Sequence, residues 1–265
     1  LLDYLARSFV DGGWDAKAMF RTLVLSATYR QDSAVAPALL ERDPENRLLG
    51  RGPRVRLPAE ILRDQALSVG GLLKHRLGGP SVFPYQPAEL YKGTVVGARY
   101  PGTSWVQSTG DDLYRRSLYT FWKRTVPHPA MTTFDAPDRE FCAVRRSRTN
   151  TPLQALTLMN ETGMVEAARA LGERMLREGG GDDAARAAFG FRLATGRPPR
   201  AAEVRVLTKA WARFRAEFAA DPKDAAAILT VGASKPDPSR PATDVAAAAA
   251  VAGIILNLDE TVTKD

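Results

Sequence analysis

The fold class of this chain is decided by the stretch VRVLTKAWARFRAEF, residues 204–218. Large apolar side chains recur in it at spacings of 3, 4, 3 and 4, at Val204, Leu207, Trp211, Phe214 and Phe218. This is the period of an α-helix that buries one face. The stripe predicts a helix packed on a core or on another helix, because cofactor sites need polar groups that it lacks.

The same helical spacing continues on both sides of this stretch. We expect further helices from Asp15 to Ala27, from Pro58 to Leu73, from Leu113 to Thr125, from Thr151 to Met175 with a break near 160–163, from Asp182 or Asp183 to Gly196, and from Asp244 to Asn257. The clearest start signal is Thr151-Pro152-Leu153-Gln154, a capping box with proline in the first turn. The chain therefore predicts a mainly α fold, an antiparallel multi-helix bundle with little β structure.

Two segments interrupt the helical pattern. Residues 78–112 are rich in glycine, proline and aromatic residues, and we expect a long irregular insertion, with a short hairpin pairing Thr94–Val96 with Trp105–Gln107. Residues 235–241 are rich in proline and predict a surface loop. We expect residues 1–265 to form one helical domain. Because the chain opens with Leu1-Leu2-Asp3 rather than a methionine or a leader segment, we expect it to be the C-terminal part of a longer protein.

Composition excludes several classes of protein. The 265 residues are 45 % apolar and 25 % charged, as in folded globular chains. The single cysteine, Cys142, excludes a disulfide framework, a cysteine-rich zinc site and a covalent haem motif within this chain. The sequence thus predicts no metal and no cofactor here. The longest apolar run, residues 245–258, has 14 residues, fewer than the roughly 20 that a membrane-spanning helix needs.

The basic excess is concentrated in one part of the chain. Lysine and arginine total 37 against 30 acidic residues, a net charge of +7. Residues 51–150 alone contain 16 basic and 8 acidic residues. A basic surface attracts nucleic acid, an anionic polysaccharide or an acidic partner, whereas a solvated or internally paired face would attract none of them.

The densest polar cluster precedes the helix start at Thr151. It brings together Asp135, Asp138 and Glu140 with Arg139, Arg145, Arg146, Arg148 and Asn150. Arginine forks match the paired oxygens of carboxylate, sulfate or phosphate groups, and a helix start adds free N–H donors. We therefore predict an oxyanion or acidic-sugar site at Arg145, Arg146, Arg148 and Asn150, with Arg115 and Arg116 as further candidates. The alternative is a structural network in which the carboxylates neutralise these arginines.

Catalysis has weaker support in the sequence. Asp135 and Asp138 could act as acid and base in glycoside cleavage. Cys142 could act as a nucleophile if His128 lay beside it. Single cysteines are usually buried, and a histidine between two prolines is typical of a rigid turn. No phosphate-binding glycine loop, Gly-x-Ser-x-Gly or His-Glu-x-x-His motif occurs, so the residues leave open whether the chain is an enzyme.

Several blocks resemble a known family. They are Leu1–Ala6 (LLDYLA), Tyr114–Arg124 (YRRSLYTFWKR), Phe134–Asp138 (FDAPD) and Thr149–Leu156 (TNTPLQAL). On these blocks the chain is similar to domain-of-unknown-function family 1553, the domain that follows planctomycete cytochrome c modules. The resemblance spans nearly the whole chain, and it brings no assigned catalytic residues.

The resemblance implies a setting rather than a reaction. It implies export to the periplasm or cell envelope, an upstream cytochrome c-type module in the same polypeptide that would carry the haem, and a connection with complex polysaccharides. Together with the residues, it favours a non-catalytic helical interaction module that presents a basic surface to an anionic ligand such as a polysaccharide. The alternative is a polysaccharide-acting enzyme that uses Asp135 or Asp138 with the arginine cluster. We do not expect nucleic acid as the partner of an exported protein.

Overall fold

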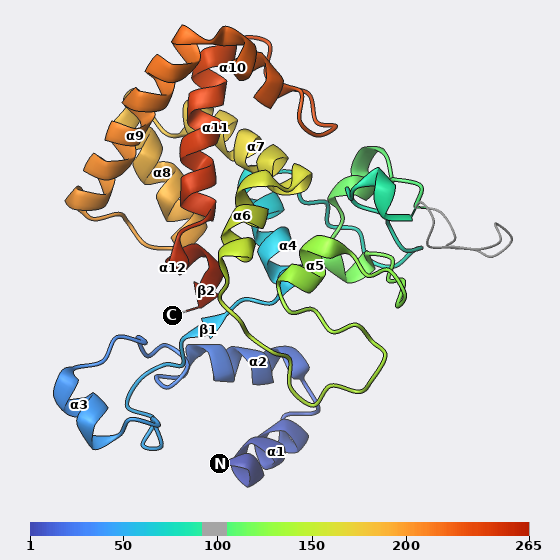
Figure 1. Ribbon diagram of the computed structural model, residues 1–265. Helices are drawn as coiled ribbons and strands as arrows, with labels where there is room; N and C mark the ends of the chain where they lie inside the picture. The colour runs from blue at the N-terminus through green and yellow to red at the C-terminus, as the bar shows by residue number, and fades with distance from the viewer. Residues whose placement is uncertain (92–104, 265) are drawn as a thin grey trace, which may run out of the picture. The chain divides into compact units, whose positions relative to one another are not determined.

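The computed structural model describes residues 1–91 and 105–264, and it is mainly helical (Figure 1). Within these residues the sheet structure is one pair of two-residue strands, β1 (Val55–Arg56) beside β2 (Thr263–Lys264). The predicted mainly α class with little β structure is confirmed. The segment Thr94–Val96, where we expected half of a hairpin, lies outside the described residues.

The chain divides into two compact units, which are described separately. The smaller unit comprises residues 1–55 with 263–265, and it contains α1 (Leu2–Asp11), α2 (Ala16–Leu25) and α3 (Pro37–Arg42). The predicted cap of α2 is confirmed, because the Asp15 carboxylate accepts hydrogen bonds from the N–H groups of Lys17 and Ala18 at 2.9 and 3.0 Å. Our expectation of a single domain over the whole chain stays a prediction.

The larger unit, residues 56–262, contains the core and the pockets considered below. Its helices are α4 (Ala59–Gly70), α5 (Pro129–Thr133), α6 (Pro152–Asn160), α7 (Thr162–Glu178), α8 (Asp183–Thr195), α9 (Ala201–Ala220), α10 (Pro222–Leu229), α11 (Ala242–Leu256) and α12 (Asp259–Val262). Helix α11 packs against α7, α8, α9 and α10 (Figure 1), and α4 packs on the other side of α7.

The central helix α11 is made of small side chains. Residues 245–249 are almost completely buried, and four of them are alanines. Where α7 crosses α11, Gly172 lies so close that a Cβ atom added to it would stand 2.6 Å from the backbone N of Ala249. Small residues on both helices therefore bring the two backbones into direct contact, which gives the core its packing density.

Local signals set most of the helix boundaries as expected. The capping box at Thr151 and Gln154 is present, and the predicted break near residues 160–163 falls at Glu161, which ends α6 and caps α7. Helix α8 is capped by Asp182 and ends at Gly196 in the left-handed conformation. The apolar stripe of α9 faces the core as predicted, with Trp211 completely buried.

One expected helix is wrong. Instead of an α-helix over 113–125, the chain has the end of one 3-10 helix, η2 (Gly110–Tyr114), then a second, η3 (Ser117–Tyr119), and then irregular chain. Their backbone groups pair outside the segment: the carbonyl of Tyr114 accepts from Lys74, and Val82 pairs with Tyr119 and Phe121. An α-helix would need the same carbonyls for its own i→i−4 bonds, so tertiary pairing overrides the local spacing.

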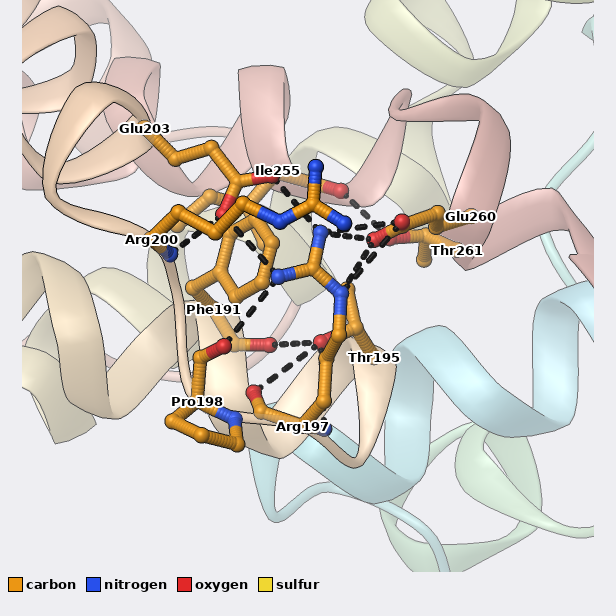
Figure 2. Close-up of polar contacts among 9 residues, drawn as sticks. All are labelled: Phe191, Thr195, Arg197, Pro198, Arg200, Glu203, Ile255, Glu260 and Thr261. Atoms are coloured by element: carbon orange, nitrogen blue, oxygen red, sulfur yellow. Dashed lines mark hydrogen bonds and ion pairs between the residues drawn. The ribbon is translucent and has the colours of Figure 1, made fainter.

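A network of charged side chains connects the turn between α8 and α9 with α12 (Figure 2). The guanidinium group of Arg197, in the turn between α8 and α9, lies 2.6 Å from a carboxylate oxygen of Glu203 and 2.7 Å from one of Glu260. Glu203 also accepts from the backbone N–H of Arg200 at 2.6 Å. This network joins the start of α9 to α12.

No helix among the described residues combines the length with the apolar character that crossing a bilayer requires.

Replacing Gly172 with alanine should force α7 and α11 apart, because its Cβ would meet backbone rather than a movable side chain. We expect G172A to lower the free energy of unfolding by about 2 kcal/mol in urea denaturation. The control is G253A in α11, whose Cβ would meet nothing within 4 Å. It should leave stability unchanged or raise it by about 0.5–1 kcal/mol. Equal effects of the two substitutions would contradict close packing at Gly172.

The Arg197 network should make stability depend on acid pH. The hydrogen bond from Arg197 lowers the pKa of Glu203 to about 2, from an ordinary value of 4.5. A lowered folded-state pKa stabilises the fold above pH 4.5, and this contribution is lost as the pH falls toward 2. The Tm of E203Q should therefore lie below that of the unchanged chain at neutral pH, and the difference should shrink on acidification.

The control for this measurement is Glu217, whose ion pair with Arg213 on α9 is mostly exposed. E217Q should change the Tm little at any pH, because exposed i,i+4 pairs contribute little. An E203Q difference that stays constant from neutral pH to pH 2 would contradict the role given to the network.

Candidate functional site

A basic cleft of about 250 Å³ lies where the sequence predicted an anion site. We use the name basic cleft for the hollow lined by Arg56, Arg145, Arg146 and Arg148 together with Asp135 and Gln154. Arg56 is the second residue of β1, whereas the three other arginines come from the exposed segment before α6. Residues far apart in sequence thus supply its walls.

Hydrogen bonds to Asp135 and Gln154 fix the position of the exposed segment that precedes α6. The Asp135 carboxylate accepts from the backbone N–H of Thr149 at 2.6 Å and from its hydroxyl at 2.9 Å. Gln154 is fully buried, and its amide nitrogen donates to the carbonyl of Thr133 and to the Thr149 hydroxyl, both at 3.0 Å. These bonds join the two ends of the segment, so they position the arginines between them.

The arginines of the cleft are unequally neutralised. Arg146 is paired with Glu60 at 2.8 Å. Burial alone would raise the pKa of Glu60, but the Arg146 bond and charge bring it below its ordinary value. No ion pair joins Arg145 or Arg148 to a carboxylate among the described residues. Their donors remain available to an anion.

Arg56 adds a partly desolvated charge to the cleft. Its Nε is buried and has no hydrogen-bond partner within the described chain. Burial lowers the pKa of Arg56, while the charge of Asp135 opposes that shift. This Nε is enclosed, so Arg56 offers an anion in the cleft the charge of its guanidinium group.

The carboxylates of the two aspartates predicted for acid–base chemistry instead accept hydrogen bonds from backbone N–H groups. Asp135 has a positive φ of 59° and binds Thr149, as described above. Asp138 accepts from the backbone N–H of Glu140 at 2.9 Å, and its carbonyl accepts from the Trp122 indole at 3.0 Å. Both carboxylates stabilise turns of the segment.

Cys142 and His128 occupy different environments. Cys142 is exposed, whereas His128 is 5 % exposed and its Nε2 lies 2.8 Å from the carbonyl oxygen of Tyr85. No hydrogen bond between the two is present in the described structure. The geometry gives no support to a thiol–imidazole pair.

The remaining candidates divide into one buried and two exposed residues. Arg115 is 1 % exposed, and its guanidinium donates to loop carbonyls, among them that of Pro80 at 3.0 Å. Its two terminal guanidinium nitrogens are thus engaged inside the protein, and its role as a ligand-binding residue stays a prediction. Arg116 is exposed and lies 3.5 Å from Asp64, and Asn150 is exposed next to the cap of α6. Neither of the two lines the cleft.

Sequence reasoning missed Arg56, Glu60 and Gln154. Arg56 belongs to the most basic part of the chain, but nothing in its neighbours marks it as a cleft residue. Gln154 was recognised as a helix cap, and its cross-link to Thr149 became visible only in the structure. The described residues contain no group of three or more histidine, cysteine, aspartate or glutamate side chains that could hold a metal ion.

Comparison with known proteins gives one match. The model of a family described as PSD1, protein of unknown function (DUF1553), matches residues 1–211. Searches of curated proteins and of solved structures gave no significant match.

Asp135 should control the order of the arginine segment. D135A removes both acceptors for Thr149 and places alanine at a positive φ, whereas D135N keeps an acceptor and tolerates that conformation. We expect trypsin to cleave after Arg145, Arg146 and Arg148 about tenfold faster in D135A, with D135N close to the unchanged chain. Circular dichroism should show the same helix content in all three. Cleavage of D135A at the unchanged rate would contradict the cross-link.

Proposed function

This chain belongs to the PSD1 family of proteins of unknown function, and we propose that it is a non-catalytic helical module that presents the basic cleft to an anionic ligand. One observation carries the proposal. Arg56, Arg145 and Arg148 surround a cleft in which no described carboxylate forms an ion pair with Arg145 or Arg148, and Arg56 adds a partly desolvated charge.

The cleft suits a sulfate or carboxylate group. Guanidinium forks bind such groups through two parallel hydrogen bonds, and a hollow of about 250 Å³ accommodates one charged group rather than a whole sugar chain. Because residues 141–150 are all exposed, a long polymer can pass along the segment while one of its charged groups enters the cleft. An anionic polysaccharide is therefore the ligand class that we propose.

A role without catalysis is supported by the aspartates. Asp135 and Asp138 hold backbone N–H groups of their own segment, so their carboxylates are engaged in structure. A reaction would need one of them to change protonation state while the segment keeps its shape. No specific observation favours the alternative of a polysaccharide-acting enzyme.

The wider setting that we propose rests on the family resemblance alone. In this proposal the module belongs to an exported protein of the periplasm or cell envelope, beside an upstream cytochrome c-type module of the same polypeptide. The haem would belong to that module, since this chain has a single cysteine and no haem attachment motif.

Binding of a polyanion should depend on the two arginines that lack ion pairs. We expect the full chain to bind dextran sulfate in calorimetry and not to bind neutral dextran. R145A/R148A should weaken dextran sulfate binding about tenfold or more, because charge-assisted hydrogen bonds to the cleft are lost. Binding should also weaken as salt is added.

The matched control is R192A/R205A, which removes two exposed arginines of α8 and α9 outside the cleft. It lowers the net charge by the same amount, so a general electrostatic attraction would respond equally to both double variants. Equal losses in the two variants would refute the cleft as the binding site, and so would binding of neutral dextran.

A further inference from the structure

A hollow of about 380 Å³ lies between the start of α9, the C-terminal end of α11 and α12. We use the name apolar hollow for the space lined by Phe191, Val206, Leu207, Ile254 and Leu258, together with the carboxylates described next. Val206 is 67 % exposed, so the hollow has an apolar edge that is open to solvent. Exposed apolar surface around a hollow is typical of a contact site for another molecule.

The charged residues that line the apolar hollow are acidic. Among the described residues they are Glu203, Asp259 and Glu260. Arg197 lies 2.6 Å from Glu203 and 2.7 Å from Glu260 (Figure 2), and the charge of Arg200 also acts on Glu203. Three carboxylates beside two guanidinium groups leave this edge with a negative balance. An apolar group flanked by positive charge therefore suits the hollow.

Phe141 is an apolar group of this kind. It is 83 % exposed, more than any other aromatic side chain in the described part of the chain. Residues 139–148 contain four arginines and one glutamate, a balance of +3. Glu60 neutralises Arg146, which leaves +2. Arg139 precedes Phe141 and Arg145 follows it, so the ring has positive charge on both sides.

Hydrogen bonds hold the chain in place on both sides of Phe141. Three residues before it, the carbonyl of Asp138 accepts from the indole of Trp122 at 3.0 Å. After it, the backbone N–H of Thr149 donates to Asp135 at 2.6 Å. A side chain on an ordered segment loses less conformational freedom on binding than one on a free chain.

The hollow that Phe141 can enter belongs to another copy of the chain. In Figure 1 the loop between α5 and α6, which contains Phe141, lies on one side of α11, and α9 lies on the other. The hydrogen bonds at Asp135 and Asp138 keep the loop on its own side. A contact between Phe141 and the apolar hollow therefore joins two molecules.

The larger pocket of this unit, about 490 Å³ between α5, α6 and the start of α7, matches Phe141 less well. Within the described chain its lining contains one carboxylate, Glu161. Burial raises the pKa of Glu161, which disfavours its charged form. The apolar hollow thus has a charge complementarity with residues 139–148 that the larger pocket lacks.

We propose that Phe141 of one copy of this chain inserts into the apolar hollow of a second copy, with the arginines of residues 139–148 beside Glu203, Asp259 and Glu260. The two surfaces of this contact differ, so the copies join head to tail. One inserted side chain makes a small interface, and the association is reversible. Neither Phe141 nor the hollow lines the basic cleft, so the contact does not depend on the anion that we propose there.

Sedimentation velocity of the full chain at increasing protein concentration tests this contact. The average sedimentation coefficient of the unchanged chain should rise with concentration. F141S should weaken association about tenfold or more, because the inserted apolar group is lost. L118S is the matched control, since Leu118 is 70 % exposed and lies outside the hollow. It should associate like the unchanged chain.

V206K tests the other side of the contact. A lysine at the edge of the hollow narrows the opening and offsets the negative balance, so association should weaken about tenfold or more. The matched control is A212K, which adds the same charge at an exposed position of α9 outside the hollow. It should leave association unchanged.

A mixture of the two variants shows whether the contact is head to tail. F141S keeps the hollow and V206K keeps Phe141, so one contact can still form between them. The mixture should give one-to-one dimers that do not grow further.

Four results would overturn the proposal. The first is an unchanged chain that stays monomeric at every concentration. The second is an F141S chain that associates as strongly as the unchanged chain, as expected if another exposed apolar surface forms the contact. The third is an equal effect of V206K and A212K. The fourth is a mixture of F141S and V206K that stays monomeric.

Discussion

Direct backbone contact between α7 and α11 at Gly172 is the constraint on which the larger unit depends. The alanines of α11 and the glycine of α7 let the two backbones approach closely at this crossing. Helix α7 makes a similar approach to α4, since a Cβ on Gly70 would lie 3.0 Å from the carbonyl oxygen of Ala167. Because α7 is packed closely on both sides, its N-terminal end is held firmly, and Glu161 at that end lines the larger pocket.

The basic cleft and the larger pocket differ in the polarity and charge of their linings. The basic cleft is open and charged, and its shape depends on a few hydrogen bonds from Asp135 and Gln154 to Thr149. The larger pocket is mostly apolar, and burial holds its His128 in the uncharged form. An anion therefore suits the cleft.

Most helices could be predicted because their signals are local. The caps at Asp15, Thr151 and Asp182 act within three residues, and the structure contains each of them. The helix expected from Leu113 to Thr125 failed because its signal was only a spacing. Backbone partners 40 positions away, such as Lys74 for Tyr114, took the hydrogen bonds that the helix needed. The sequence identified the cluster before Thr151 as basic, but it could not show which of its arginines form ion pairs and which remain open to a ligand.

By itself, the sequence determined the mainly helical class, the breaks between helices and the position of the basic segment, because each depends on residues within about one turn of one another. Tertiary structure alone decided which charges are compensated. Glu60 neutralises Arg146 across 86 positions, Arg115 is buried among loop carbonyls, and Arg145 and Arg148 stay beside an open cleft. The charge available to a ligand depends on which groups folding brings within hydrogen-bond distance, and no local pattern records those distances.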